Sequence, residues 1–345
     1  MMILDLPSPC GDKSKITPGK RSRPGRRAEK AEVGPTVPSP SVIGVPKNMI
    51  EVPAGRYVMG SDDHYAEERP AHEEHVSPFL IDEHPVTNAE FRRFVKDTNY
   101  RTTAETAPSA EEFPDADPDD LVPGSLVFRP TPGPVPLDDW RRWWHWTRGA
   151  HWRAPDGPGS SIGGKELHPV VHISFEDALA YARWAGKDLP TEVEWEYAAR
   201  AGRPPTVYAW GDEFMPRGRP MANTWHGEFP WQTAKAPGKD RTTPVGRFPA
   251  NDWGLVDMMG NVWEWTASAW TDDHGGRLAE PSSSPSCCAP QDPLRALEED
   301  DRNVMKGGSH LCAPSYCLRY RPPARQGQAV RSSTSHLGFR CIIRP

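Results

Sequence analysis

Proline is the residue that most limits what this chain can fold into. There are 40 prolines and 29 glycines among 345 residues. Each proline removes a backbone hydrogen-bond donor, and glycine permits turns that other residues disfavour. Long helices and wide sheets are therefore not expected. The 14 tryptophans act in the opposite direction, because large buried rings can hold an irregular chain together. The composition predicts a compact, loop-rich globule.

The first 46 residues differ from the rest in composition. Between residues 13 and 30 there are eight lysines and arginines among proline, glycine and serine, and aromatic residues are almost absent. Such a segment cannot bury enough apolar surface to offset the entropy lost on ordering. We predict a disordered basic tail over residues 1–46, with weak contact to anions or a membrane surface as the alternative, and one folded domain over residues 47–345.

Charge and cysteine usage exclude several classes of protein. The formal net charge is −6, so the whole chain is not expected to bind nucleic acid. No apolar run approaches 18 residues, and the apolar start is too short for a secretory signal, so no membrane association is expected. The six cysteines are few and clustered late, unlike a disulfide framework. These features predict a cytoplasmic protein, which we expect to be a monomer.

Local patterns predict a few short elements. Residues 49–60 have a strand, turn, strand pattern. Residues 88–95 have apolar side chains at helical spacing. Ser174 and Gly186 are suited to begin and end a second helix, because serine caps the first amides and glycine accepts a left-handed conformation. Residues 191–194 form a capping box that starts a third helix.

Three other stretches are distinctive in composition. Residues 103–140 are acidic and proline-rich, which predicts an excursion over the surface. Residues 269–303 form a long polar insertion that contains Cys287 and Cys288, which we interpret as non-catalytic. A dense group of tryptophans is expected to staple loops in the core, with a wall of the active-site cleft as the alternative. Its members are Trp140, Trp143, Trp144, Trp146 and Trp152.

Cys312 and Cys317 are the most informative residues in the chain. On a straight strand they would be roughly 17 Å apart, and on a helix they would point about 140° apart. The two thiols can meet only if the loop folds back. Pro314 and the preceding glycines at 307–308 make such a loop possible.

Two converging thiols allow three interpretations. They could form a structural disulfide, which a reducing compartment disfavours, or a redox pair, for which a shorter spacing is more usual. They could also bind a soft metal ion. Two thiolates suit Cu(I), whereas zinc prefers four ligands, and a linear metal site would hold the sulfurs more than about 4 Å apart. The spacing alone leaves these interpretations open.

The residues around this pair resemble a known family. The segment Gly307–Arg321 closely resembles the active-site end of formylglycine-generating enzymes. Further matching blocks lie at residues 53–60, 189–197, 223–230, 254–255, 260–266, 324–325 and 332–341. The resemblance covers about residues 48–345, and the cysteine pair inside the Gly-Gly-Ser loop is its specific part. It implies an irregular, loop-rich α+β fold related to C-type lectin-like domains.

The resemblance also implies a function. Members of this family hold Cu(I) between two cysteines that match Cys312 and Cys317. With O2 and a thiol reductant, they oxidise the cysteine of a Cys-x-Pro-x-Arg segment in an unfolded sulfatase to formylglycine. Ser309 matches an active-site serine that could orient oxygen or substrate, although it could be an ordinary turn hydroxyl. Arg325 matches an arginine of the substrate cleft, with a surface ion pair as the alternative. His336 replaces an asparagine near the cleft, so substrate recognition is expected to differ.

Two calcium sites are implied in the same way. The ligands of the first site, which combine two carboxylates with two backbone carbonyls, are Asp257, Gly260, Val262 and Glu264. Asn223 and Thr224 match half of a second site. There the family's aspartate and carbonyl donor fall on Pro237 and Lys239, so calcium binding would require Asp240 as a substitute.

Two rival functions follow from the same family likeness. One is an iron-dependent sulfoxide synthase, which usually carries an added N-terminal four-helix domain with a histidine-rich motif. Residues 1–46 are too short and polar for that domain. The other is a non-catalytic binding module, which would have no reason to place two cysteines in the loop. Both comparisons favour the oxidase.

Overall fold

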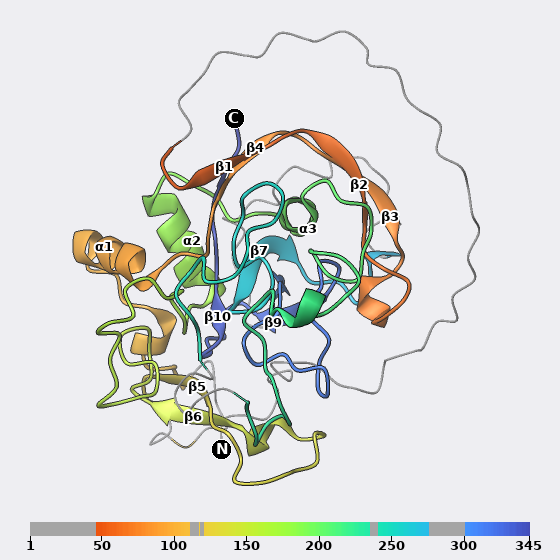
Figure 1. The fold of residues 1–345 in the computed structure, drawn as a ribbon. Coiled ribbons are helices and arrows are strands. Elements are labelled where there is room, and N and C mark those ends of the chain that lie inside the picture. The colour runs from red at the N-terminus through yellow and green to blue at the C-terminus, as the bar shows by residue number, and fades with distance from the viewer. Residues whose placement is uncertain (1–45, 111–116, 118–120, 235–240, 276–300) are drawn as a thin grey trace, which may run out of the picture.

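The computed structural model describes residues 46–110, 117, 121–234, 241–275 and 301–345. Residues 1–45 of the predicted tail at 1–46 lie outside these residues, as do most of the polar insertion, Cys287 and Cys288. The described chain has short helices and small sheets joined by long loops (Figure 1). The helices are α1 (Asn88–Thr98), α2 (Phe175–Trp184) and α3 (Glu192–Arg200), with 3-10 turns η2 (Ala66–Glu68), η3 (Thr103–Glu105), η5 (Trp140–Arg142) and η6 (Pro216–Gly218).

The strands form four small sheets. Their bounds are β1 (Met49–Val52), β2 (Gly55–Met59), β3 (His72–Val76), β4 (Phe79–Asp82), β5 (Gly124–Phe128), β6 (Trp144–Arg148), β7 (Trp263–Ala269), β8 (Arg302–Lys306), β9 (Arg325–Ala329), β10 (Leu337–Gly338) and β11 (Ile342–Ile343). The sheet orders are β1-β4-β11, β10-β7-β8-β9, β2-β3 and β5-β6. The four-stranded sheet leads directly into the cysteine loop, because that loop follows β8.

The first four strands form one bent ribbon. β1 pairs with β4 and β2 pairs with β3, both antiparallel, and Figure 1 shows the two pairs following one another along a curve. The two strands predicted over residues 49–60 are confirmed, but the expected turn between them is wrong. The residues between β1 and β2 do not reverse the chain, because both strands pair with the returning segment at residues 72–82.

All three predicted helices are present, and side-chain caps explain where they begin. α1 starts with a capping box from Thr87, α2 with one from Ser174, and α3 with the one predicted from Thr191. In each box the hydroxyl and an acidic side chain satisfy amides that have no partner within the helix. Gly186 lies just past α2 with a φ of 66°, as a helix-ending glycine should.

The segment predicted to run over the surface is partly buried. Within residues 103–140, all five residues of β5 are buried. β5 pairs with β6, and the carbonyl of Leu126 accepts a hydrogen bond from the amide of Ser335. The acidic, proline-rich composition of the whole stretch hid one short apolar strand, so the surface prediction is wrong for residues 124–128.

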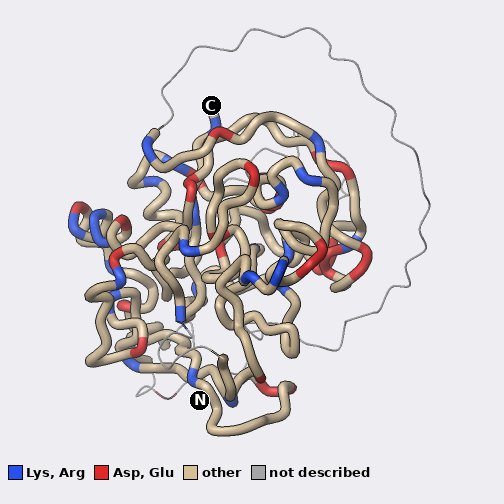
Figure 2. The backbone as a smooth tube through the Cα atoms, in the orientation of Figure 1, with Lys and Arg blue, Asp and Glu red and all other residues tan. Residues whose placement is uncertain are grey.

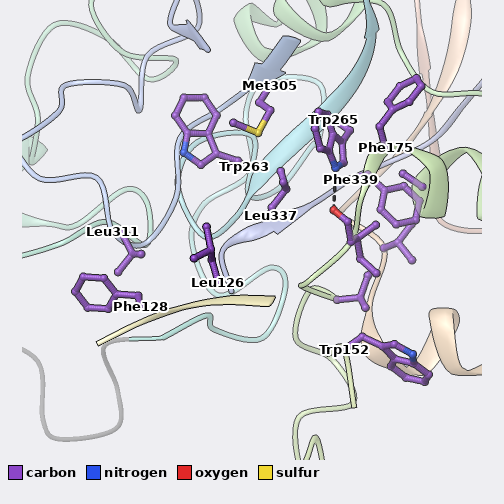
Figure 3. Packing of buried hydrophobic residues seen from close by; sticks show 14 of the residues in the cluster. Leu126, Phe128, Trp152, Phe175, Trp263, Trp265, Met305, Leu311, Leu337 and Phe339 are labelled. Carbon is purple, nitrogen blue, oxygen red and sulfur yellow. Dashed lines mark hydrogen bonds between the residues drawn. The ribbon is translucent and has the colours of Figure 1, made fainter. Parts of the chain in front are cut away.

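Aromatic residues fill the larger of two cores. Figure 3 shows Phe128 near Leu311, and Trp263 and Trp265 beside Met305 and Leu337, with the Trp265 indole donating to the Ile173 carbonyl at 2.9 Å. Of the tryptophans predicted to staple loops, three are buried and Trp146 is 36% exposed. The buried ones are Trp143, Trp144 and Trp152.

Among the described residues, no helix has the length and apolar character needed to cross a bilayer.

Candidate active site

The cysteine loop begins with two glycines at positions where no other residue would fit. Gly307 and Gly308 follow β8 with φ angles of 92° and 70°. A Cβ atom on Gly307 would lie 2.8 Å from the Met258 carbonyl oxygen, and one on Gly308 would lie 2.8 Å from the Arg319 carbonyl oxygen. Both the backbone angles and the close approach therefore exclude a side chain. These glycines bring the start of the loop against its end.

Two successive turns then fold the loop back on itself. The amide of Cys312 donates to the Ser309 carbonyl at 3.0 Å, and the amide of Ser309 lies 3.4 Å from the Cys312 sulfur. The amide of Cys317 donates to the Ala313 carbonyl at 2.9 Å, which closes a helical turn between the cysteines. Both cysteine side chains are buried. The loop reversal that the sequence required is present.

One buried phenol, that of Tyr320, interacts electrostatically with both cysteines. Burial raises the pKa of Tyr320 well above its usual value, and the charges of Tyr208, Cys312 and Cys317 raise it further. The Tyr320 ring stacks on Tyr208 at 5.8 Å between ring centres. Cys312, Cys317 and Tyr320 also belong to the same cluster of buried hydrophobic residues.

Ser309 has a clear role in the turn itself. Its hydroxyl oxygen accepts a hydrogen bond from the Leu311 amide at 3.2 Å, and its side chain is fully buried. The structure thus shows the turn hydroxyl that was the alternative interpretation. This bond uses the oxygen as an acceptor, so the hydroxyl proton can still be donated.

Aromatic rings pack against the middle of the loop. The ring of Tyr316 stacks on Phe229 at 4.5 Å with an interplanar angle of 6°, and its edge contacts Trp143 at 5.5 Å. Phe229 also contacts Phe128 and Trp225, at 5.7 and 5.4 Å. The Trp143 ring therefore packs in the core and against Tyr316 of the cysteine loop, as the core interpretation of the tryptophan group predicts.

Ion pairs hold the chain just after Cys317. Arg319 contacts Glu67 at 2.6 Å, and Arg321 forms two hydrogen bonds with Glu68, at 2.5 and 2.9 Å. All four side chains are buried. Our sequence analysis did not identify Glu67 and Glu68 as site residues. About 250 residues separate the partners along the chain, and no local pattern marks such a contact.

Arg325 lies in this buried ionic region and not at the surface. It forms an ion pair with Glu192 at 2.8 Å and donates to the carbonyls of Thr271 and Glu67 at 2.9 and 3.1 Å. Burial would raise the pKa of Glu192, but the charges of Arg325 and Lys306 outweigh it and hold that pKa well below its usual value. The alternative interpretation, a surface ion pair, is therefore wrong in position, because the ion pair is buried. The Arg325 guanidinium is thus already hydrogen-bonded to oxygen atoms of the protein.

His336 is also buried, with a side chain that is 1% exposed. Its Nδ1 atom lies 2.5 Å from the Thr334 hydroxyl, and its ring meets Trp144 edge-on at 4.7 Å. Its carbonyl accepts from the Trp263 amide at 2.9 Å. Arg325 and His336 thus lie in separate buried contacts, one ionic and one aromatic.

The first predicted calcium site contains an oxygen suited to a cation. Asp257 Oδ2 accepts from the Gly246 amide at 2.7 Å, but Oδ1 is buried without a hydrogen-bond partner among the described residues. Burial raises the pKa of Asp257 to about 6. Glu264 already receives two hydrogen bonds from Arg340, at 2.7 and 2.8 Å, and one from Trp195. The donor set fits a hard cation best at Asp257, because an unpaired buried carboxylate oxygen is costly.

The second predicted calcium site can be followed only in part. Asn223 and Thr224 are buried, and the Asn223 amide donates to Asn261 Oδ1 at 3.2 Å. Thr224 Oγ1 lies 3.3 Å from His226 Nε2. The remaining positions of this site fall within residues 235–240, outside the described residues. In the part of the chain that is described, no group of three His, Cys, Asp or Glu side chains could hold a metal ion. Neither the cysteine pair nor the first calcium site requires such a group.

Comparison with known proteins defines the class. Residues 36–345 match the model of the sulfatase-modifying factor enzyme 1-like domain. The chain belongs to this family, and the predicted family and enzyme class are confirmed. It is 51% identical to the formylglycine-generating enzyme of Mycobacterium tuberculosis over 86% of this chain and 98% of that protein.

Two further comparisons give the range of the family. The chain is 40% identical to a Bos taurus protein named inactive C-alpha-formylglycine-generating enzyme 2, over 85% of this chain and 87% of that one. The solved structure of PvdO from Pseudomonas aeruginosa superposes with a TM-score of 0.54 at 24% identity, covering 86% and 94% of the two chains. The irregular α+β fold expected from the sequence is confirmed.

Proposed function

We propose that this chain converts the cysteine of a Cys-x-Pro-x-Arg segment in an unfolded sulfatase to C-alpha-formylglycine, with Cu(I) held by Cys312 and Cys317. The observation that carries the proposal is the loop reversal, which buries both cysteines beside one phenol in a chain that belongs to this family. Thiolates are soft donors suited to Cu(I), and the surrounding rings keep water away from the sulfurs.

The reaction needs electrons from two sources. The substrate side chain changes from a thiol to an aldehyde, which consumes a water molecule and releases hydrogen sulfide, two protons and two electrons. Reduction of O2 to water takes four electrons, so a thiol reductant supplies the other two and becomes a disulfide. Copper, when bound, supplies the oxygen chemistry that protein side chains lack. The chain's own residues hold the sulfur ligands in place, and the backbone amide of Ser309 lies 3.4 Å from the Cys312 sulfur.

A peptide assay tests this function. A Cys-x-Pro-x-Arg peptide incubated with copper-loaded protein, O2 and a thiol should lose about 18 Da by mass spectrometry, because an aldehyde replaces the thiol. Cys312→Ser and Cys317→Ser should each abolish both Cu(I) binding and the mass change. Cys341→Ser is the matched control, since Cys341 is buried against Asp82 in another part of the fold. A loaded protein that leaves the peptide unchanged would refute the oxidase function.

We also propose calcium at the first implied site, supported by the unpartnered Asp257 oxygen. A ligand present at 100 times its dissociation constant stabilises the folded state by about 2.7 kcal/mol. Chelation of calcium should therefore lower the melting temperature of the unchanged protein. It should not alter the melting temperature of the Asp257→Asn variant. An identical shift in both proteins would place the effect elsewhere. For Asn223 and Thr224 we propose only a weaker second site.

We propose a cytoplasmic, monomeric protein as the setting for this chemistry. The support consists of the small number of cysteines and the burial of Cys312, Cys317 and Cys341 as free thiols. Fractionation of cells that express the protein, followed by light scattering of the purified protein, tests both points. Secretion of the chain or a stable dimer would contradict them.

A further inference from the structure

One short segment far from the cysteine loop contacts the chain that leaves it. The segment consists of Tyr65 and the 3-10 turn η2, which ends at Glu68. Figure 2 shows acidic positions gathered at η2 and along β3, where this segment lies. Opposite it runs the stretch from Leu318 to Arg325, which begins directly after Cys317.

Tyr65 makes the contact nearest to the cysteine pair. The amide of Leu318 donates to the Tyr65 hydroxyl oxygen at 3.2 Å, and Leu318 is the residue bonded to Cys317. The Arg319 guanidinium lies over the Tyr65 ring at 4.1 Å from its centre, which is within the range of a cation–π interaction. Tyr65 is 2% exposed, so solvent does not compete for either contact.

The ion pairs fix this tyrosine against the loop. Glu67 and Glu68, two and three residues after Tyr65, bind Arg319 and Arg321 on the other stretch. The Arg321 Nε atom also donates to the Leu318 carbonyl at 2.7 Å. The peptide groups on both sides of Leu318 are therefore held, one by Tyr65 and one by Arg321. Directional bonds of this kind set an orientation, whereas ring packing mainly fills space.

We propose that Tyr65 is a positioning residue, which sets the place of the Cys317 sulfur relative to Cys312 through its bond to the Leu318 amide. The proposal deepens the proposed function and rests on it for the metal. Without this bond the loop spends less time in the conformation that presents both sulfurs, and apparent affinity falls with that fraction. Burial raises the pKa of Tyr65, and Cys317 adds to the rise, which agrees with its closeness to the sulfur.

The test compares two tyrosine variants of the full chain. Tyr65→Phe removes only the hydroxyl that accepts from Leu318. Tyr57→Phe is the matched control, because the Tyr57 hydroxyl also bonds to the backbone, donating to the Val193 carbonyl at 2.8 Å. Loss of one hydrogen bond should weaken Cu(I) binding by up to about fivefold in Tyr65→Phe, measured against a competing chelator. Tyr57→Phe should bind like the unchanged chain.

A second readout requires no metal. In the metal-free protein, the rates at which Cys317 and Cys341 are alkylated can be followed by mass spectrometry. Tyr65→Phe should speed alkylation of Cys317 by up to about fivefold through local opening, and leave Cys341 unaffected. Equal acceleration at both cysteines, or none at Cys317, would overturn the positioning role. If the unchanged chain binds no Cu(I), the proposed function fails, and the alkylation rates still decide the role of Tyr65.

Discussion

The cysteine loop is supported in two different ways at its two sides. Around Tyr316 the support is aromatic, from a set of rings that stack and meet edge-on. After Cys317 the support is ionic, from carboxylates and guanidinium groups that are almost completely buried. We call these the aromatic side, with Phe229 at its centre, and the ionic side, with Glu68 at its centre.

The difference teaches how each side should respond to change. Ring contacts are broad and only weakly directional, so a replacement of similar volume keeps most of the packing. A buried ion pair depends on both partners, because losing one leaves the other charge without water or a counter-charge. A substitution on the ionic side should therefore lower the free energy of unfolding strongly, whereas one on the aromatic side should lower it only slightly.

Breaking the ionic side should have the largest effect. Glu68→Gln leaves the Arg321 guanidinium without its carboxylate. Because both side chains are 0% exposed, water cannot replace the lost charge. The free energy of unfolding should fall by about 3–5 kcal/mol. Urea denaturation measures this loss.

An exposed pair of similar geometry provides the control. Arg203 binds Asp252 through two hydrogen bonds, at 2.6 and 2.7 Å, but the two side chains are 37% and 54% exposed. Asp252→Asn should cost less than about 1 kcal/mol, because water and salt screen the charges. If the two variants lost equal stability, burial would not be the cause of the large loss in Glu68→Gln.

Away from the ionic side, one buried histidine should make stability depend on pH. The buried His172 Nε2 atom lies 2.8 Å from the Pro155 carbonyl, and Nδ1 lies 2.8 Å from the Ser125 hydroxyl on β5. A carbonyl can only accept, so the neutral ring carries its proton on Nε2. Burial lowers the pKa of His172 to about 4. The unfolded chain, with a histidine pKa of about 6.5, therefore binds the proton first as pH falls.

This difference predicts a loss of stability in acid. The His172 contribution should be full above pH 7 and should fall by about 2.5 kcal/mol between pH 7.5 and 4.5. Asp177 acts oppositely, because burial raises its pKa to about 6 and its folded form gains protons first. The two effects partly cancel in the unchanged chain. The variant to compare is His172→Asn, because asparagine tolerates the φ of 62° at this position. The difference in the free energy of unfolding between this variant and the unchanged chain should be smaller at pH 4.5 than at pH 7.5. A gap that is constant with pH would contradict this assignment.

A change on the aromatic side should be the mildest. Phe229→Leu keeps most of the buried volume but loses ring contacts with Phe128, Trp143, Trp225 and Tyr316. We expect a loss of about 1–2 kcal/mol in the free energy of unfolding.

Phe94→Leu is the control for that change, because Phe94 also contacts four rings and lies away from the cysteine loop. The two variants should lose similar stability, and only Phe229→Leu should alter Cu(I) affinity. A loss at Phe229 as large as that at Glu68 would erase the distinction between the two sides.

The sequence predicted what local patterns can encode. The capping residues Ser174 and Thr191 gave the starts of α2 and α3, because each cap acts within four residues. The glycines at 307–308 and the cysteine spacing likewise required a folded-back loop. The buried strand β5 was missed because five apolar and small residues are a weak signal inside an acidic, proline-rich stretch.

The candidate site was predicted only as far as its own segment. The resemblance assigned Arg325 to the substrate cleft, with a surface ion pair as the alternative, and no local pattern indicated that Glu192 on α3 neutralises it in the interior. Tyr65, Glu67 and Glu68 carried no local mark, since their partners are more than 250 residues away. Long-range pairs of this kind depend on the folded topology and not on any pattern along the chain.

That separation has a consequence for the order of events during synthesis. When the ribosome has made residues 1–318, both cysteines exist, but Arg319, Arg321 and Arg325 do not. The sheet that contains β4 also lacks its last strand at this point, because β11 has not yet been made. A chain of this length therefore lacks the guanidinium groups that pair with Glu67, Glu68 and Glu192. A polypeptide halted at residue 318 would present both thiols with nothing to orient them.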